Sequence, residues 1–229
     1  MKITLLNFTP NPEKTIVLAA KLCYSDSSIS QLEDKVKDVS VEKFLNKILQ
    51  MGHLSVLEHS TFTFGIEGIS RATSHQLVRH RLASYSQQSQ RYVKFKEPEF
   101  VIPPTIKNND GITKKFSDTV ESLYDFYQEM LNAGIPAEDA RYIFPNAATT
   151  KIIVTMNARE LLHFFGLRTC ERAQWEIREM AKKMLSLVKK EAPLIFKKAG
   201  PGCVSTNKCT EGEMTCGRPD EIREEFRKL

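Results

Sequence analysis

Arginine, histidine and serine gather in one short stretch, RHRLASYSQQSQRY, at residues 79–92. It holds three arginines, one histidine and three serines, with no lysine and no acidic residue. No arginine precedes Arg71, and no lysine lies between Lys47 and Lys94. Because a guanidinium matches phosphate and carboxylate geometry and stays charged at biological pH, this segregation predicts an anion site. Chance clustering on a solvated face is the alternative.

A helix is predicted over roughly residues 69–80, and it places Arg71, His75 and Arg79 on one face. Like charges one turn apart destabilise an isolated helix, so a bound anion would relieve their repulsion. Gln76 lies three residues before Arg79 and can point at the same ligand. A solvated polar face without a ligand is the alternative.

The stretch NARELLHFFGLR, residues 157–168, is the second dense group of chemistry-bearing residues. Asn157 is the expected N-cap of a helix that carries Arg159, His163 and Arg168. Helix N-termini favour anions, although a core helix with surface arginines would show the same pattern. Neither common glycine-rich nucleotide loop occurs in the chain.

Metal and nucleophile chemistry are not favoured by the residue patterns. The spacing of His53, Glu58 and His59 differs from the H-E-x-x-H zinc motif, so a structural pair or a cofactor-edge contact is expected. A serine nucleophile needs a neighbouring base, and no G-x-S-x-G turn holds the serines of residues 79–92.

Three of the five cysteines lie near the C-terminus, at Cys203, Cys209 and Cys216. This spacing matches no standard zinc pattern, and a fourth ligand is missing from it. We therefore expect reduced thiols and no metal, with an intersubunit or metal site as the less favoured alternative.

Composition predicts one intracellular domain. The chain has 229 residues, 41% of them hydrophobic, which is enough for one sizeable core. The net charge of +5 suits anionic ligands. The apolar run at the N-terminus is too short for a signal peptide, and no run approaches the ~20 residues that span a bilayer. We expect a cytoplasmic protein without a membrane segment.

Hydrophobic periodicity predicts an α+β fold, a single domain with a mixed or antiparallel sheet flanked by helices. We expect the body at residues 1–199 and a cysteine-containing extension at 200–229. Strands are predicted at 2–8, 60–68, 91–100 and 149–156. Helices are predicted at 11–25, after Ser40, at 69–80, 114–132, 136–144, 157–166 and 171–192, with a turn at 108–111.

Four blocks of the chain resemble the flavin-dependent thymidylate synthases, the thymidylate synthase X family. RHRLASYSQQSQR fits that family's signature R-H-R-x-x-S-x-x-x-x-S-x-R. GHLSVLEHSTFTF, DARYIFP and NARELLHFFGLR with the following AQWEI resemble the other blocks, in order and at suitable spacing. The resemblance covers roughly residues 1–197.

The resemblance implies a reaction and an assembly. The family makes dTMP from dUMP, with methylenetetrahydrofolate as the one-carbon donor and FADH2, regenerated by NADPH, as the hydride donor. It uses no covalent enzyme nucleophile. Its members have a thymidylate synthase-complementing-protein fold and form homotetramers with active sites at subunit interfaces.

The resemblance also implies site residues. Arg168 matches the arginine that polarises uracil at N3, and His53 a histidine near the flavin and folate edge. The implied FAD contacts are Ser55, Arg79, His80, Arg81, Gln87, Asn157, Arg159 and His163. The implied dUMP contacts are Gln76, Arg79, Gln87, Gln88, Ser89, Gln90, Arg91, Arg141 and Arg168, with the arginines serving the phosphate.

Two positions depart from some relatives, which carry Asn and Glu where this chain has Ser86 and Gln87. A glutamine cannot supply a carboxylate, but an amide or main-chain contact would survive. A nucleic-acid-binding protein, suggested by the pI of about 8.9, and a flavoprotein with another substrate remain alternatives. We expect no nucleic-acid partner.

Overall fold

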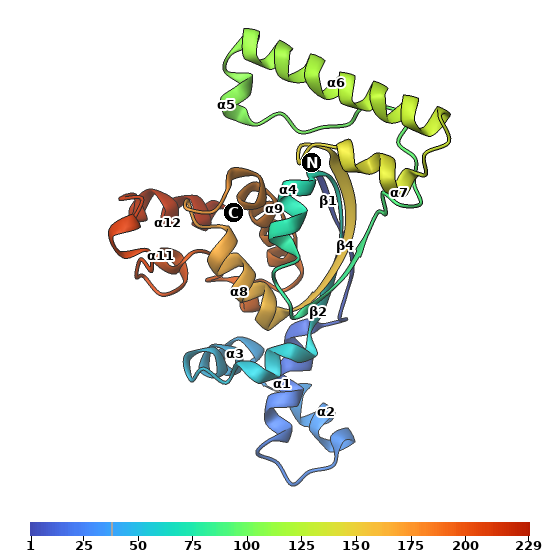
Figure 1. The fold of residues 1–229 in the computed structure, drawn as a ribbon. Coiled ribbons are helices and arrows are strands. Elements are labelled where there is room, and N and C mark those ends of the chain that lie inside the picture. The colour runs from blue at the N-terminus through green and yellow to red at the C-terminus, as the bar shows by residue number, and fades with distance from the viewer. Residues whose placement is uncertain (38) are drawn as a thin grey trace. The chain divides into compact units, whose positions relative to one another are not determined.

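The computed structural model of the protein describes residues 1–37 and 39–229 (Figure 1). The described strands are β1 (Lys2–Phe8), β2 (Thr61–Ser70), β3 (Ala83–Gln87) and β4 (Thr149–Asn157). The described α-helices are α1 (Pro12–Leu22), α2 (Ile29–Lys37), α3 (Val41–Gln50), α4 (Arg71–Leu77), α5 (Pro104–Lys107), α6 (Asp110–Asn132), α7 (Ala137–Ala140), α8 (Ala158–Arg168), α9 (Trp175–Glu191), α10 (Pro193–Phe196), α11 (Gly202–Ser205) and α12 (Pro219–Lys228). The 3-10 helices are η1 (Leu54–His59), η2 (Arg141–Ile143) and η3 (Gly212–Met214).

The four strands form one antiparallel sheet in the order β1-β2-β4-β3. Strand β2 alternates between apolar and smaller residues, and its Phe62, Phe64 and Ile66 are buried. The Thr63 and Thr155 hydroxyls lie 2.9 Å apart where β2 pairs with β4. The predicted α+β fold with a sheet flanked by helices is confirmed.

Within this domain the chain divides into two compact units. Unit 1 comprises Met1–Lys2, Ile66–Arg79 and Tyr85–Ile153. Unit 2 comprises Ile3–Gly65, His80–Ser84 and Val154–Leu229. Residues 200–229 belong to unit 2, and their description as a separate extension stays a prediction.

Unit 1 has a small aromatic core under helix α6. Tyr124 and Tyr127 of that helix are buried, and their ring centroids lie 4.7 and 4.5 Å from that of Phe144. Asn109 caps α6 by accepting from the Ile112 N–H, so the expected turn at 108–111 is confined to Asn108 and Asn109, and Asp110 and Gly111 are helical.

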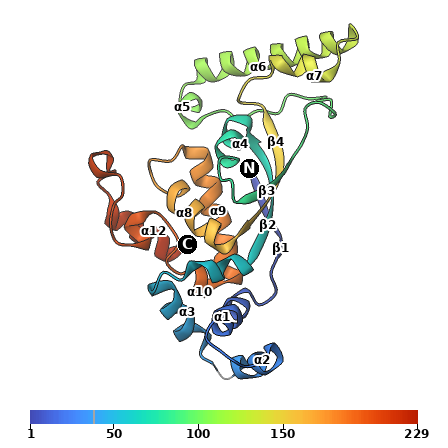
Figure 2. The ribbon, with the colours of Figure 1, turned by 60° about the horizontal axis from the view of Figure 1, so that its bottom comes forward.

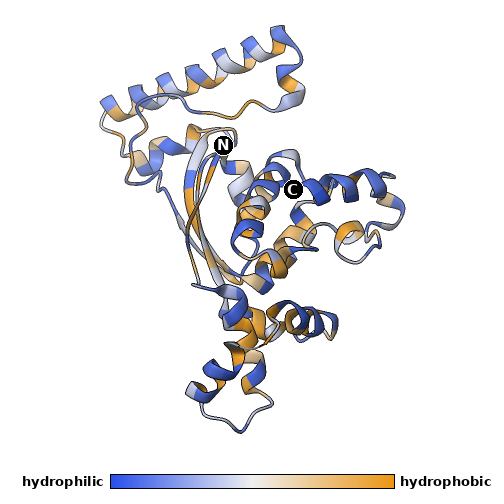
Figure 3. Cartoon of the chain, turned by 180° about the vertical axis from the view of Figure 1, so that it is seen from behind, coloured by the Kyte–Doolittle hydropathy of each residue, from blue (hydrophilic) through white to orange (hydrophobic). Residues whose placement is uncertain are grey.

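Unit 2 holds the larger core, built around α8 and α9, which pack against each other. Phe62, Phe196 and Phe165 form a chain of edge-to-face rings through it. Helices α1, α2, α3 and α10 gather around the same unit, as Figure 2 shows. Helix α12 is mainly hydrophilic (Figure 3), but it buries Ile222 and Phe226. Helix α12 therefore packs through these two side chains.

Three other expectations about elements differ from the structure. The expected strand at 91–100 forms only an isolated bridge from Phe100 to Ala148, because Pro98 lacks the N–H that a ladder needs. A strand forms instead at β3, where none was predicted. The expected helix at 69–80 is shorter, so Arg79 lies beyond the end of α4 and the helical face of Arg71, His75 and Arg79 does not form.

The remaining expected elements are confirmed, with ends moved by a few residues. Ser40 and Asn157 cap α3 and α8 through their side chains, as predicted. No helix in the described residues has the length and apolarity to cross a membrane.

Candidate functional site

Helix α8 positions the central group of unit 2. Asn157 accepts the Glu160 N–H at 2.9 Å, and this cap starts the helix. Glu160, Phe164 and Arg168 follow at intervals of four residues, so they lie on one face. Glu160 is in the first turn, where the helix dipole favours an anion, and Arg168 is in the last turn, where it favours a cation.

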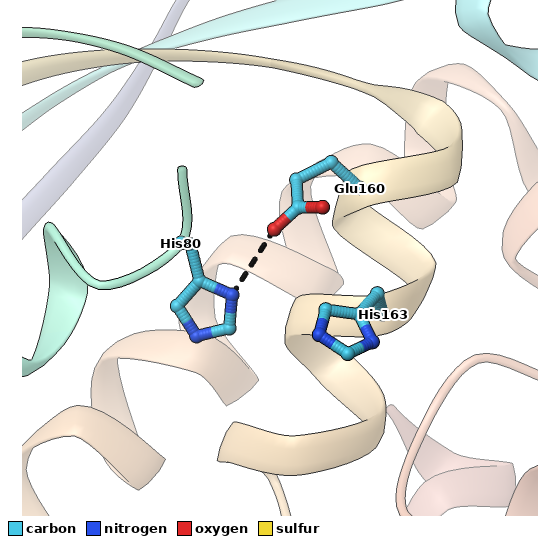
Figure 4. A group of neighbouring side chains, drawn as sticks. All are labelled: His80, Glu160 and His163. Atoms are coloured by element: carbon cyan, nitrogen blue, oxygen red, sulfur yellow. Dashed lines mark hydrogen bonds and ion pairs between the residues drawn. The ribbon is translucent and has the colours of Figure 1, made fainter. Parts of the chain in front are cut away.

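His80 lies across this face of α8 and is buried. Its Nδ1 is 3.1 Å from Oε1 of Glu160, and a dashed line marks this contact in Figure 4. Arg168 donates from Nε to Nε2 of His80 at 3.0 Å. The Phe164 ring meets the imidazole edge-on, with centroids 4.9 Å apart. We call Glu160, His80 and Arg168 the His80 network.

The hydrogen bonds of the His80 network define one tautomer. Nε2 of His80 accepts from a guanidinium, so the ring proton is on Nδ1 and is donated to the Glu160 carboxylate. Burial lowers the pKa of His80, the Arg168 charge lowers it further, and Glu160 opposes the change. His80 is therefore neutral at pH 7, and it orients the Arg168 guanidinium by accepting its Nε–H.

The side chains of His80, Glu160 and His163 place one ligand atom each within 4.8 Å of one another (Figure 4). This spacing would suit a metal ion. However, both ring nitrogens of His80 already bond to protein groups, and Arg168 puts a positive charge beside them. A hydrogen-bonded network accounts for the arrangement better than a cation site, and the absence of a metal there stays a prediction.

The 3-10 helix η1 packs against α8 and brings more of the expected residues to unit 2. Arg159 donates from Nη1 to Oε1 of Glu58 at 2.5 Å, with both side chains about half-exposed. His53 and Ser55 are exposed at the start of this segment, and Arg81 is exposed beyond His80. Since Glu58 pairs with Arg159, the sequence group of His53, Glu58 and His59 forms no described metal cluster.

Unit 1 contains a separate cluster of arginines around Glu138. The Nε of Arg91 is 2.5 Å from the Glu138 carboxylate, and Arg141 donates from Nε to the Glu138 carbonyl at 2.9 Å. Burial lowers the pKa of Arg71, and the like charge of Arg141 lowers it further. We call Arg71, Arg91 and Arg141 the unit 1 arginine cluster. The Arg91 guanidinium pairs with the Glu138 carboxylate, whereas that of Arg141 bonds to the Glu138 main chain, so the cluster is suited to an added anion.

The glutamine and serine positions of unit 1 lie at the end of β3 and just after it. Gln87 donates from Nε2 to the Thr150 hydroxyl at 3.1 Å. The Gln88 N–H donates to the Lys151 carbonyl at 2.9 Å. Ser89 accepts the Arg91 N–H at 3.1 Å, which is a turn contact and gives no activating base. Gln76, Gln90 and Arg79 also belong to unit 1, the two glutamines partly buried and Arg79 exposed.

Sequence reasoning missed Glu160 and Cys170. Glu160 forms the second bond of the His80 network, and its signal was its place three residues after an N-cap and eight before Arg168. Cys170 lies in unit 2 beside the three tail cysteines. No spacing rule links it to them, because they lie 33 or more positions further along the chain.

Comparison with known proteins shows the family to which this chain belongs. The sequence model of the family "Thymidylate synthase complementing protein" matches residues 4–194. A flavin-dependent thymidylate synthase of Geobacter sulfurreducens is 57% identical, covering 100% of this chain and 99% of its own length. Enzymes with the same name from Clostridium tetani and Pyrococcus furiosus are each 48% identical, over 97% and 93% of this chain and 96% and 91% of their own.

Proposed function

We propose that the His80 network and the unit 1 arginine cluster carry the reaction of this protein. The chain belongs to the family of flavin-dependent thymidylate synthases and converts dUMP to dTMP. It is an FAD-dependent enzyme. Methylenetetrahydrofolate supplies the carbon, and reduced FAD supplies the hydride when bound. No side chain serves as covalent nucleophile, which agrees with the described hydrogen bond of Ser89, a turn contact that accepts the Arg91 N–H.

The donor set of unit 2 fits FAD. The proposed contacts there are Ser55, His80, Arg81, Asn157, Arg159 and His163, with His53 near the edge of the flavin and the folate. Arg81 and the half-exposed Arg159 supply cationic donors of the kind that a pyrophosphate requires. The two carboxylates nearby, Glu58 and Glu160, are each paired, so they do not repel an anionic cofactor at full strength.

The donor set of unit 1 fits the nucleotide substrate. We assign the phosphate of dUMP to Arg79, Arg91 and Arg141. We also assign it to Arg71, because the charge of Arg141 contributes to the lowered pKa of Arg71. A phosphate dianion would relieve the repulsion within this cluster. Further contacts are assigned to Gln76, Gln88, Ser89 and Gln90, and Gln87 is assigned to both ligands.

Arg168 is assigned to the uracil ring at N3. A guanidinium beside N3 favours the deprotonated ring, as any close opposite charge lowers a pKa. The neutral His80 holds Nε of Arg168, and Glu160 holds His80, so the plane of the guanidinium is set before substrate arrives. The bond from Arg168 to His80 is the single observation that carries this assignment.

We further propose a cytoplasmic homotetramer with active sites at subunit interfaces, and NADPH as the reductant. Three exposed apolar side chains support the assembly: Leu82, Tyr92 and Tyr142 are 71%, 76% and 84% exposed, and each directly follows a candidate arginine. Light scattering should give four times the chain mass of 26.1 kDa. A monomer at working concentration would overturn this assembly.

The visible absorption spectrum of the purified protein, supplied with FAD, tests the function. Adding dUMP should perturb the flavin bands, and dTMP should form only when methylenetetrahydrofolate and a reductant are both present. Faster turnover with NADPH than with NADH would support the proposed reductant. If FAD binds and dUMP leaves the bands unchanged, the enzyme acts on another substrate. Loss of all flavin binding would refute the assignment of unit 2.

A further inference from the structure

Four of the five cysteines line one small cavity in unit 2. Cys170 follows α8, Cys203 lies on α11, and Cys209 and Cys216 lie in the segment between α11 and α12. All four border a cavity of about 20 Å³, together with Glu211. The fold therefore supplies the fourth cysteine that the tail sequence lacks.

The segment around this cavity has almost no apolar core of its own. Residues 205–217 are exposed except for the partly covered Glu211 and Cys216, and only a short 3-10 turn interrupts their irregular path. Polar contacts hold the segment, since Arg172 donates to the carbonyls of Met214 and, at 3.1 Å, Thr215. A bound metal ion would stabilise this segment, as it does small domains that bury little apolar surface.

A polar contact also links the two sides of the cavity, because the Cys170 thiol donates from Sγ to Oε1 of Glu211 at 3.8 Å. Four thiolates gathered at one small cavity would repel one another, and a divalent cation bound among them would remove that repulsion.

We propose that Cys170, Cys203, Cys209 and Cys216 bind one Zn²⁺ ion as a structural four-thiolate site. Four cysteines and no other donor are a standard zinc set. The cavity of about 20 Å³ has room for one ion but not for a four-iron cluster. The site fastens the segment before α12 to the end of α8, whose last residue is Arg168.

The sulfur atoms must draw together to share one ion. In the described residues the four sulfurs do not form a group already spaced for a metal ion, whereas thiolates on one zinc ion are roughly 4 Å apart. Cys209 is exposed, and the segment that carries it contains Gly212 and Gly217 at positive φ. These features let the segment close on an ion without disturbing a packed core.

Metal analysis of the full-length protein, purified with reductant and dialysed against zinc-free buffer, tests the site. We expect one zinc per chain in the wild-type protein. Cys209→Ser and Cys216→Ser should lose at least nine-tenths of it. Cys23→Ser is the matched control, because Cys23 is exposed and borders no part of the cavity, and it should keep the full amount.

Alkylation of the wild-type protein, read by mass spectrometry, keeps the test decisive if the variants do not fold. With zinc bound, only Cys23 should react quickly, and a chelator should expose Cys209 and Cys216. Equal reactivity of Cys209 with and without chelator would overturn the site. Zinc retained by both serine variants, bound iron with acid-labile sulfide, or a disulfide within the quartet under reducing conditions would each also overturn it. None of these readouts depends on dTMP formation.

Discussion

Replacing Arg168 with alanine should separate catalysis from folding. The Arg168 side chain donates from Nε to Nε2 of His80 and is only partly buried. Losing one such hydrogen bond costs about 1 kcal/mol of unfolding free energy, or a Tm shift of about 2–4 °C for a chain of this size. The variant should therefore stay folded at 25 °C.

The expected loss of activity is much larger than the loss of stability. A guanidinium near uracil N3 lowers the pKa of that group by 1–3 units, and each unit is about 1.4 kcal/mol. Arg168→Ala should therefore make dTMP about 10- to 1,000-fold more slowly. FAD affinity should change by less than about threefold, because the proposed contacts of Arg168 are with uracil and His80.

The assay is dTMP formation under saturating dUMP, with FAD binding followed by flavin absorption and folding by thermal denaturation. Arg168→Lys keeps the charge but not the Nε–H bond to His80, so it should recover only part of the rate. Arg227→Ala, at a 76% exposed side chain on α12, is the control and should behave as wild type. Turnover of Arg168→Ala within threefold of wild type would refute the role of the His80 network.

Three further predictions concern pH, packing and substrate affinity. Burial lowers the pKa of His80, so below pH ~6.5 the unfolded chain binds more protons than the folded chain. The contribution of neutral His80 to stability is therefore full above that pH and is lost as pH falls through the lower folded pKa. Denaturant titrations at pH 5 and 7.5 should show a smaller difference in unfolding free energy in His80→Gln than in wild type. Gly200 has φ 154° and an added Cβ would lie 2.8 Å from the Phe226 ring, so Gly200→Ala should lower the unfolding free energy by about 2–5 kcal/mol, and an unchanged Tm would contradict this. Arg141→Gln should weaken dUMP binding about 10- to 100-fold in calorimetry and leave FAD binding unchanged, whereas equal loss of both ligands would indicate misfolding.

The helices and strands that arise from a local sequence pattern were predictable. Alternation in β2 and amphipathic spacing in α6 appear directly in the sequence, and both elements formed. In β3, Ala83 and Tyr85 alternate with serines, but five residues are too short a pattern to predict a strand, and they form one because β4 lies beside them. Pairing between distant segments leaves little local signal, which is why no strand was predicted there.

The residues of the candidate site were also predictable only in part. The types and spacing of the arginines after Arg71 were enough to predict an anion site, since guanidinium chemistry belongs to the residue itself. Family resemblance then supplied a ligand for most of the residues assigned above. The partners of those residues were not predictable: Glu160 contacts His80 across 80 positions of the chain, and Arg91 reaches Glu138.

The sequence by itself determined the residue chemistry of this protein, the class of its fold and the enzyme family to which it belongs. Only the tertiary structure decided that His80 is buried and neutral between Glu160 and Arg168, because burial and orientation depend on how α8 packs. It also decided that Cys170 joins the three tail cysteines at one cavity. A proton's location and a fourth ligand both arise from contacts between segments that are remote along the chain.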